Sequence, residues 1–184
     1  MQNIFASGGL WATPWMDRVL PQIVSLVAHH PARTLFTRFI TPESADDRPG
    51  RWQRYFTRWS QATRGRLPQG ALDLVAPLAR FVPPASILDK PAYSAFAGSG
   101  LAAMLLQKDI SAVIITGSET DVCVLSSVLS AIDHGFRVIV AEDGLCSSSD
   151  AGHDALMTLY RTRFTEQIEL MTIEEVCALW HDET

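Results

Sequence analysis

Cys123 lies at the start of a predicted helix, in the stretch VIITGSETDVCVLSSVLSAIDHG, residues 113–135. An apolar strand-like run ends at Gly117 and leads into this helix, with Thr120 or Asp121 as its predicted N-cap. In the first helical turn, free backbone N–H groups and the helix dipole favour a thiolate, which would make Cys123 a better nucleophile. The same N–H groups could hold the oxyanion that forms when a thiolate attacks a carbonyl or nitrile carbon. By position alone, Cys123 is either such a nucleophile or a small buried apolar side chain.

Lys90 is the second candidate for chemistry, in the stretch ILDKPAYSAF, residues 87–96. The chain has only one other lysine, Lys108, against thirteen arginines. Lys108 follows a predicted helix in a polar turn and is expected to be exposed, whereas Lys90 ends a short apolar strand where a charge needs a partner. At the carboxyl end of a strand, Lys90 could stabilise a thiolate or an oxyanion.

The elements that must position these residues alternate along the chain. Predicted strands cover residues 33–40, 86–89, 112–116, 137–141 and, more weakly, 168–170; predicted helices cover residues 13–29, 51–60, 99–107, 121–134, 150–162 and 172–181. This alternation predicts an α/β domain with a mainly parallel sheet and helices on both faces. Active sites in such domains gather at the carboxyl ends of the strands.

Composition narrows the class of protein. With 184 residues, 47% of them hydrophobic, the chain is expected to form a single domain over residues 1–184. A net charge of −5 argues against a nucleic-acid partner, and no apolar run approaches the length of a membrane span. Three cysteines are an odd count without zinc-like or disulfide-like spacing, so Cys146 and Cys177 are expected to be structural thiols. We therefore expect a cytoplasmic protein that acts on a small molecule.

Three segments together resemble the isochorismatase-like cysteine hydrolases. They are TGSETDVCV, the Lys-Pro-x-Tyr-Ser-Ala-Phe segment that begins at Lys90, and the Asp-Gly-x-x-Ser-Ser pattern after RVIVAED. The resemblance runs from Met1 to about residue 175 and implies a three-layer α/β/α fold with a Cys–Asp–Lys triad. By this match Cys123 is the nucleophile and Lys90 the triad lysine. It also implies a cis peptide at Ser118–Glu119 that directs the amides of Glu119 and Cys123 into an oxyanion hole.

The same resemblance raises a question about the first five residues. In this family the first strand ends Asp-Met-Gln-x-x-Phe, and that Asp is the general acid/base. Here Met1 to Phe5 (MQNIF) matches everything after the Asp, and Asp17 falls too far along the chain to replace it. We therefore expect the acid/base and its strand to lie upstream of Met1.

Differences among family members bear on the substrate. Members that hydrolyse nicotinamide carry metal-binding histidines after the second strand, but the stretch TRFITPESADDRPGRW has none. The five histidines are expected at helix ends or on helix surfaces: His29, His30, His134, His153 and His181. We therefore expect neither a metal nor another cofactor. Members acting on isochorismate lack the cysteine, so Cys123 favours cleavage of a C–N bond in a small amide or carbamoyl compound. A non-catalytic binding or assembly protein and an isochorismate-type vinyl ether hydrolase are the alternatives.

An arginine-rich and aromatic segment, residues 48–66, surrounds the predicted helix 51–60. Its aromatic residues recur at helical spacing, with the arginines largely on the other side. The segment is either an amphipathic helix packed on the domain or a neighbouring subunit, or a lid over an anionic or aromatic substrate. Exposed aromatics here favour a homo-oligomer.

Further side chains are assigned from the motifs that they flank. Phe5, Trp11 and Tyr93 are candidates for the wall of the substrate pocket. Asp143 is expected to accept backbone N–H groups in the turn before the helix at 150. Glu119 is expected to turn toward a salt bridge or a subunit contact, because a carboxylate in the pocket would oppose thiolate formation.

Overall fold

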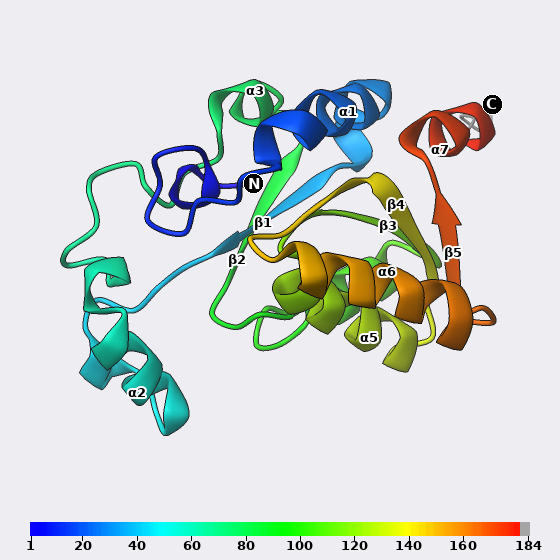
Figure 1. Cartoon of the computed structure of the whole chain (residues 1–184). Helices are drawn as coiled ribbons and strands as arrows, with labels where there is room; N and C mark the ends of the chain where they lie inside the picture. The colour runs from blue at the N-terminus through cyan, green and yellow to red at the C-terminus, as the bar shows by residue number, and fades with distance from the viewer. Residues whose placement is uncertain (181–184) are drawn as a thin grey trace.

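The strands of the computed structural model form two parallel sheets that lie side by side (Figure 1). The structure describes residues 1–180, so His181 and the end of the predicted helix 172–181 lie outside the described part. One sheet pairs β1 (Leu35–Phe39) with β2 (Ser86–Lys90), and the other has the order β3 (Ala112–Ser118), β4 (Arg137–Cys146), β5 (Ile168–Met171). All pairings between these strands are parallel, as predicted.

The division into two sheets differs from the single sheet that the sequence predicts. Within residues 1–180, β1 is hydrogen-bonded to β2 alone and β3 to β4 alone. The apolar run of β3 is only half-buried, whereas Val138, Val140 and Ala141 of the neighbouring β4 are 0% exposed. No described strand separates β1 from β3, which is why the sheet is interrupted there.

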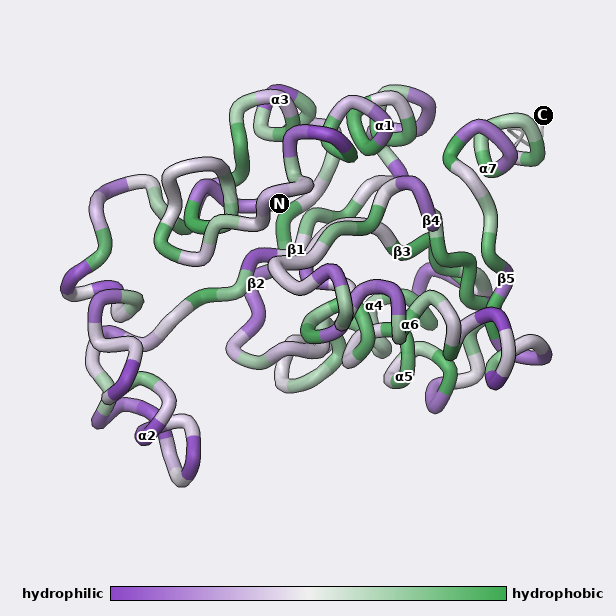
Figure 2. The backbone as a smooth tube through the Cα atoms, in the orientation of Figure 1, coloured by the Kyte–Doolittle hydropathy of each residue, from purple (hydrophilic) through white to green (hydrophobic). Residues whose placement is uncertain are grey.

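Helices cover both sides of the strands, which gives the three predicted layers. On one side lie α1 (Met16–His29), the short α3 (Ala76–Ala79) and α7 (Ile173–Leu179); on the other lie α4 (Leu101–Gln107), α5 (Leu125–Asp133) and α6 (Asp150–Arg163) (Figures 1 and 2). In α1 the apolar positions predicted from the sequence, Val19, Ile23 and Leu26, are all buried. The α/β/α architecture is therefore confirmed.

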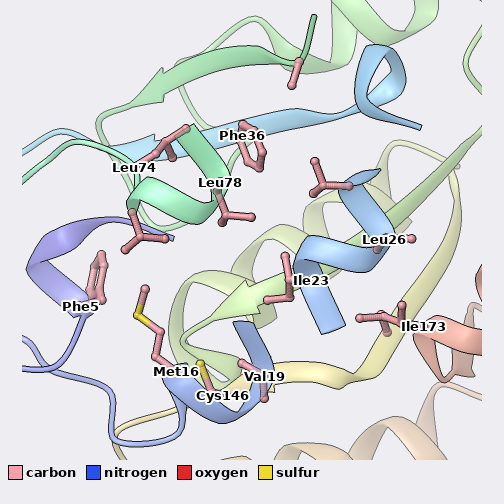
Figure 3. Packing of buried hydrophobic residues seen from close by; sticks show 14 of the residues in the cluster. Phe5, Met16, Val19, Ile23, Leu26, Phe36, Leu74, Leu78, Cys146 and Ile173 are labelled. Carbon is pink, nitrogen blue, oxygen red and sulfur yellow. The ribbon is translucent and has the colours of Figure 1, made fainter. Parts of the chain in front are cut away.

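Each helical layer packs on its own hydrophobic core. The first core joins α1, β1, α3 and α7 through residues such as Met16, Ile23, Phe36 and Leu78 (Figure 3). The second lies between β4, α5 and α6 and contains Val128, Val138 and Tyr160. Hydrophobic residues predominate along β3, β4 and α5 (Figure 2), and in β4 they are buried as a parallel strand covered on both faces requires. None of the helices among residues 1–180 has the length and hydropathy of a membrane span.

Several element boundaries differ from the predictions. The helix predicted from residue 13 begins at Met16, because Thr13 is held by a backbone hydrogen bond to Phe5 O at 2.8 Å. The strand predicted for residues 137–141 continues to Cys146 beyond a register shift opposite Ile115 and Gly117. Residues 120–124 form a wider π-helical turn before α5 instead of the start of a regular α-helix.

The helix α2 (Arg51–Arg58) stands away from the sheets with its polar side outward (Figures 1 and 2). Its aromatic side faces the molecule: Phe56 is fully buried and stacks on Phe39 of β1, with ring centroids 6.5 Å apart. Trp52 packs edge-on against Tyr93 at 4.9 Å. The apolar face of α2 is thus covered within the chain itself.

Candidate active site

Cys123 lies in the turn that joins β3 to α5, at the carboxyl end of the sheet. The peptide bond between Ser118 and Glu119 is cis, and the π-helical turn Thr120–Val124 follows at once. The carbonyl of Glu119 accepts hydrogen bonds from the amides of Val122 (3.2 Å) and Val124 (3.0 Å). The predicted N-cap is wrong: Glu119 occupies the capping position without a side-chain cap, because Thr120 and Asp121 bind the segment after β4 instead.

Lys90 ends β2 and extends toward Cys123 from the other sheet. Its side chain is 4% exposed, and its ammonium donates to the carbonyls of Ala92 (3.0 Å) and Tyr93. It also lies 5.5 Å from the centre of the Phe39 ring. The Lys90 ammonium and the Cys123 thiol each shift the pKa of the other, so the two groups lie close together. The two residues singled out first from the sequence are therefore neighbours in the structure.

Burial and charge act on this pair in opposite directions. Burial raises the pKa of the Cys123 thiol above its usual range, while the nearby Lys90 ammonium lowers it and the Glu119 carboxylate raises it further. Burial likewise lowers the pKa of Lys90, and the Cys123 thiolate opposes that shift. The lowered thiol pKa expected from the helix terminus is therefore not found, since desolvation is the largest effect. Lys90 is the main feature that restrains it.

Glu119 does not make the salt bridge expected for it within the described residues. Its Oε1 accepts the backbone N–H of Ser148 at 3.2 Å. The Glu119 carboxylate also raises the pKa of Cys123, Tyr55 and Tyr93. A negative charge at this point opposes the thiolate, which is the effect that the sequence argument attributes to a carboxylate in the pocket.

Aromatic side chains from several segments form one cluster. Trp11 contacts Phe5 (5.8 Å between centroids), Phe39 (6.2 Å) and Tyr55 (6.3 Å), so the candidates Phe5 and Trp11 lie in one cluster. Tyr93, the third candidate, interacts with both Tyr55 and Cys123. The structure thus brings all three candidates to the same side of the molecule.

Tyr55 lies in the same aromatic cluster, and the sequence analysis did not single it out. It belongs to the aromatic face of α2, and burial together with Tyr93, Glu119 and Cys123 raises its pKa, so its hydroxyl stays protonated. The helical spacing of aromatics in residues 52–59 was the available signal. It indicates a buried face but does not tell which side chain on that face reaches the nucleophile.

The segment after β4 holds the Cys123 turn from the opposite side. The Ser147 hydroxyl donates to Asp121 Oδ1 at 2.6 Å, and the Thr120 hydroxyl lies 2.9 Å from His153 Nδ1. A Cβ atom on Gly152 would come within 2.1 Å of Asp121 Oδ2, so a glycine is needed for this close approach. His153 was expected on a helix surface, but it is half-buried because its ring faces Thr120.

The remaining thiols and acids have structural surroundings. Cys146 is fully buried at the end of β4, and Cys177 is half-buried in α7. Asp143 is structural, as expected, but its partner differs: Oδ1 accepts the N–H of Ile173 at 2.8 Å, at the start of α7. The N-cap of α6 is Ser149, which accepts the Gly152 N–H at 3.0 Å, so Asp143 is not needed there.

Three more histidines within the described residues, His29, His30 and His134, have their partners elsewhere in the fold. The rings of His29 and His30 approach the Trp180 carbonyl, and His134 follows α5 with its ring against Phe96. Within residues 1–180, no group of three or more His, Cys, Asp or Glu side chains gathers as metal ligands would.

Comparisons with known proteins identify the family of this chain. The model of the isochorismatase domain family matches residues 1–172. Maleamate amidohydrolase of Pseudomonas putida is 30% identical over 118 residues, which cover 64% of this chain and 53% of that protein. The isochorismatase family protein PncA of Bacillus subtilis is 36% identical over 66 residues, 36% of each chain. The chain thus spans about half or less of the length of these curated relatives.

Solved structures show the same fold. A cysteine hydrolase from Pseudomonas syringae pv. phaseolicola superposes with a TM-score of 0.81 at 22% identity, covering 97% of this chain and 87% of the other. N-carbamoylsarcosine amidase from Thermoplasma acidophilum superposes with a TM-score of 0.74 at 18% identity, covering 95% and 92%. With the family match over residues 1–172, the conclusion is direct: this chain belongs to the isochorismatase family of hydrolases.

Proposed function

We propose that this protein is a cysteine hydrolase that cleaves the C–N bond of a small amide or carbamoyl compound. The observation that carries the proposal is a buried lysine ammonium close to a thiol in the turn after β3, Lys90 near Cys123. The similarity to maleamate amidohydrolase and, in fold, to N-carbamoylsarcosine amidase supports this substrate class.

In the proposed reaction the Cys123 thiolate attacks the carbonyl carbon of the substrate. The C=O electrons move onto oxygen, and the resulting oxyanion is held by the backbone amides of Glu119 and Cys123. When the carbonyl re-forms, the C–N bond breaks and ammonia or an amine leaves with a proton from a general acid. Water then adds to the thioester with loss of a proton to the same group, and the acid product and the thiol are released.

Lys90 has a defined part in these steps. Its ammonium is fixed by the carbonyls of Ala92 and Tyr93, so the charge stays beside the sulfur without needing to reorganise. It offsets part of the desolvation that raises the thiol pKa. A thiolate that forms beside Lys90 is therefore stabilised relative to one in the same site without it.

We further propose that the general acid/base is an aspartate on an additional strand between β1 and β3. This proposal is supported by the edges of the two sheets: within the described residues, each of these strands pairs on one side only. The apolar run Val113–Ile115 of β3 stays half-buried, as a central strand would without its second neighbour.

The position of the first residues supports the direction of such a strand. The Gln2 side chain donates to Phe39 O at 3.1 Å and accepts from Phe39 N at 2.8 Å, which fixes Gln2 at the carboxyl end of β1. Met1 packs against the first hydrophobic core, which contains Cys146. A strand leading into Met1 would run parallel to β1 and β3 and end at the same edge as Lys90.

Ammonia release from a panel of small amides and carbamoyl compounds, measured with the additional strand supplied as a peptide ending in Asp, tests the function. Cys123→Ala should abolish turnover, and Cys177→Ala, which changes a half-buried thiol in α7, should leave it intact. Turnover that survives Cys123→Ala would refute the covalent mechanism. A folded protein that hydrolyses none of these compounds, even when the additional strand is supplied, would favour the binding or assembly alternative.

The acid/base proposal has its own test. A C-terminally amidated, apolar eight-residue peptide ending in Asp is added to the protein, with an otherwise identical peptide ending in Asn as the control. Both should raise the melting temperature by filling the sheet, but only the Asp peptide should support hydrolysis. An unchanged melting temperature with both peptides would contradict the proposed additional strand between β1 and β3.

A further inference from the structure

His153 faces the Cys123 turn from the first turn of α6. Its Nδ1 lies 2.9 Å from the hydroxyl of Thr120, which is fully buried and follows Glu119 directly. On another side, the Trp15 ring packs edge-on against the imidazole with centroids 5.1 Å apart. The imidazole is therefore held between the start of α1 and the turn that carries the thiol.

The Thr120 contact is one of three that join this turn to residues 147–153. Glu119 accepts the Ser148 N–H, and Asp121 accepts the Ser147 hydroxyl. These two partners lie in the loop before α6, whereas His153 is part of the helix itself, with its own N–H donated to Ser149 O at 2.9 Å. His153 thus ties the turn to a regular element.

A displacement of Thr120 would shift the Cys123 thiol and the backbone amides of the turn. The Glu119 carbonyl, which binds the amides of Val122 and Val124, belongs to the peptide unit that connects Glu119 to Thr120. Cys123 lies between these two amide donors. The backbone from Glu119 to Cys123 therefore moves as a unit, and the Thr120 side chain is its buried attachment point.

We propose that His153 is a positioning residue that holds Thr120 and, through it, the thiol and backbone amides of the Cys123 turn. The significance for catalysis rests on the proposed cysteine hydrolase function, but the positioning of the thiol can be measured without a substrate. The hydrogen bond supplies direction, and the contact with Trp15 keeps the ring in one orientation.

The test is the rate of Cys123 alkylation by iodoacetamide as a function of pH, followed by mass spectrometry of the labelled peptide. His153→Ala should slow alkylation about three- to tenfold and displace the midpoint of the pH profile. His153→Asn, whose amide can take the place of Nδ1, should restore most of the rate. The matched control is His134→Ala, which changes the histidine directly after α5, with its ring on Phe96. This variant should leave the pH profile of Cys123 alkylation unchanged.

Thr120→Val removes the other partner of the contact. If the hydrogen bond carries the effect, the double variant with His153→Ala should be no slower than the slower single variant. Additive effects, or a pH profile of His153→Ala that coincides with that of the wild type, would overturn the proposal. If His153→Ala does not fold, His153→Asn and Thr120→Ser decide the matter, because both keep a hydrogen-bonding atom and should keep the wild-type profile. Failure of the hydrolase proposal would show as turnover in Cys123→Ala, a result independent of these alkylation rates.

Discussion

Cys123 and Cys146 are neighbouring thiols in different circumstances. Cys146 pairs in the sheet with Ser118, the last residue of β3, and Cys123 lies in the turn that follows. Burial raises the pKa of both thiols, that of Cys146 to about 12. The Lys90 ammonium lies near Cys123 and lowers its pKa.

The difference lies in what surrounds each sulfur. Cys146 is 0% exposed within a strand and belongs to the first hydrophobic core. Cys123 is partly exposed in a turn, and an ammonium fixed by backbone carbonyls lies near enough to lower its pKa. Burial of a thiol is thus not enough for chemistry. The thiol also needs access and a partner held in place.

The largest expected effect is the difference in turnover between two alanine variants, one at each thiol. Cys123→Ala should lose all turnover without loss of stability, because the thiol forms the bond to the substrate. Cys146→Ala should keep turnover and lose about 1 kcal/mol of unfolding free energy, because it removes a core contact. Ammonia release and thermal melting, measured on both variants, check this. Loss of turnover in both variants would contradict the purely structural role given to Cys146.

Lys90→Met should lower turnover about 100-fold, since it removes a fixed charge beside the reacting sulfur. Lys108→Met changes an exposed lysine after α4 and serves as the control. Equal rates for the two variants would show that Lys90 has no part in the reaction.

Gly152→Ala should lower the free energy of unfolding by about 1–2 kcal/mol, although alanine is normally favoured over glycine in a helix. The added Cβ would meet the Asp121 carboxylate, which Ser147 holds in place. In an Asp121→Ala background the same change should cost nothing. A destabilisation that persists there would place its cause elsewhere than in the contact with Asp121.

The smallest effect is expected from Glu119→Gln. The Glu119 carboxylate raises the pKa of Cys123, so its neutralisation should lower that pKa and speed alkylation about twofold at pH 7.5. The rate should converge with that of the wild type at high pH, where both thiols are ionised. A slower rate at pH 7.5 would contradict the sign of this interaction.

Local patterns predicted most of the fold. The buried face of α1 follows from the spacing of Val19, Ile23 and Leu26, and the core strand β4 from its continuous apolar run. The break between β1 and β3 could not be predicted in this way, because an apolar run indicates burial but not which neighbour provides it. The π-helical turn at residues 120–124 likewise depends on contacts with residues 147–153, far along the chain.

The site residues that could be predicted are of rare types at unusual positions in the predicted elements. Cys123 and Lys90 were identified because a thiol at a helix start and a lysine at a strand end both need an explanation. The roles of Tyr55 and His153 arise from tertiary neighbours, which helical spacing does not specify. The raised pKa of Cys123 was also missed, since the sequence shows the helix terminus but not the extent of desolvation.

The most direct test of the central claim is the pH dependence of Cys123 alkylation in the wild type and in Lys90→Met. If the Lys90 ammonium restrains the pKa of the buried thiol, the wild-type midpoint lies well below that of Cys146. Lys90→Met should then move it upward by about one pH unit or more. A midpoint that is the same in both proteins would contradict the account, because Lys90 would then have no effect on the pKa of Cys123.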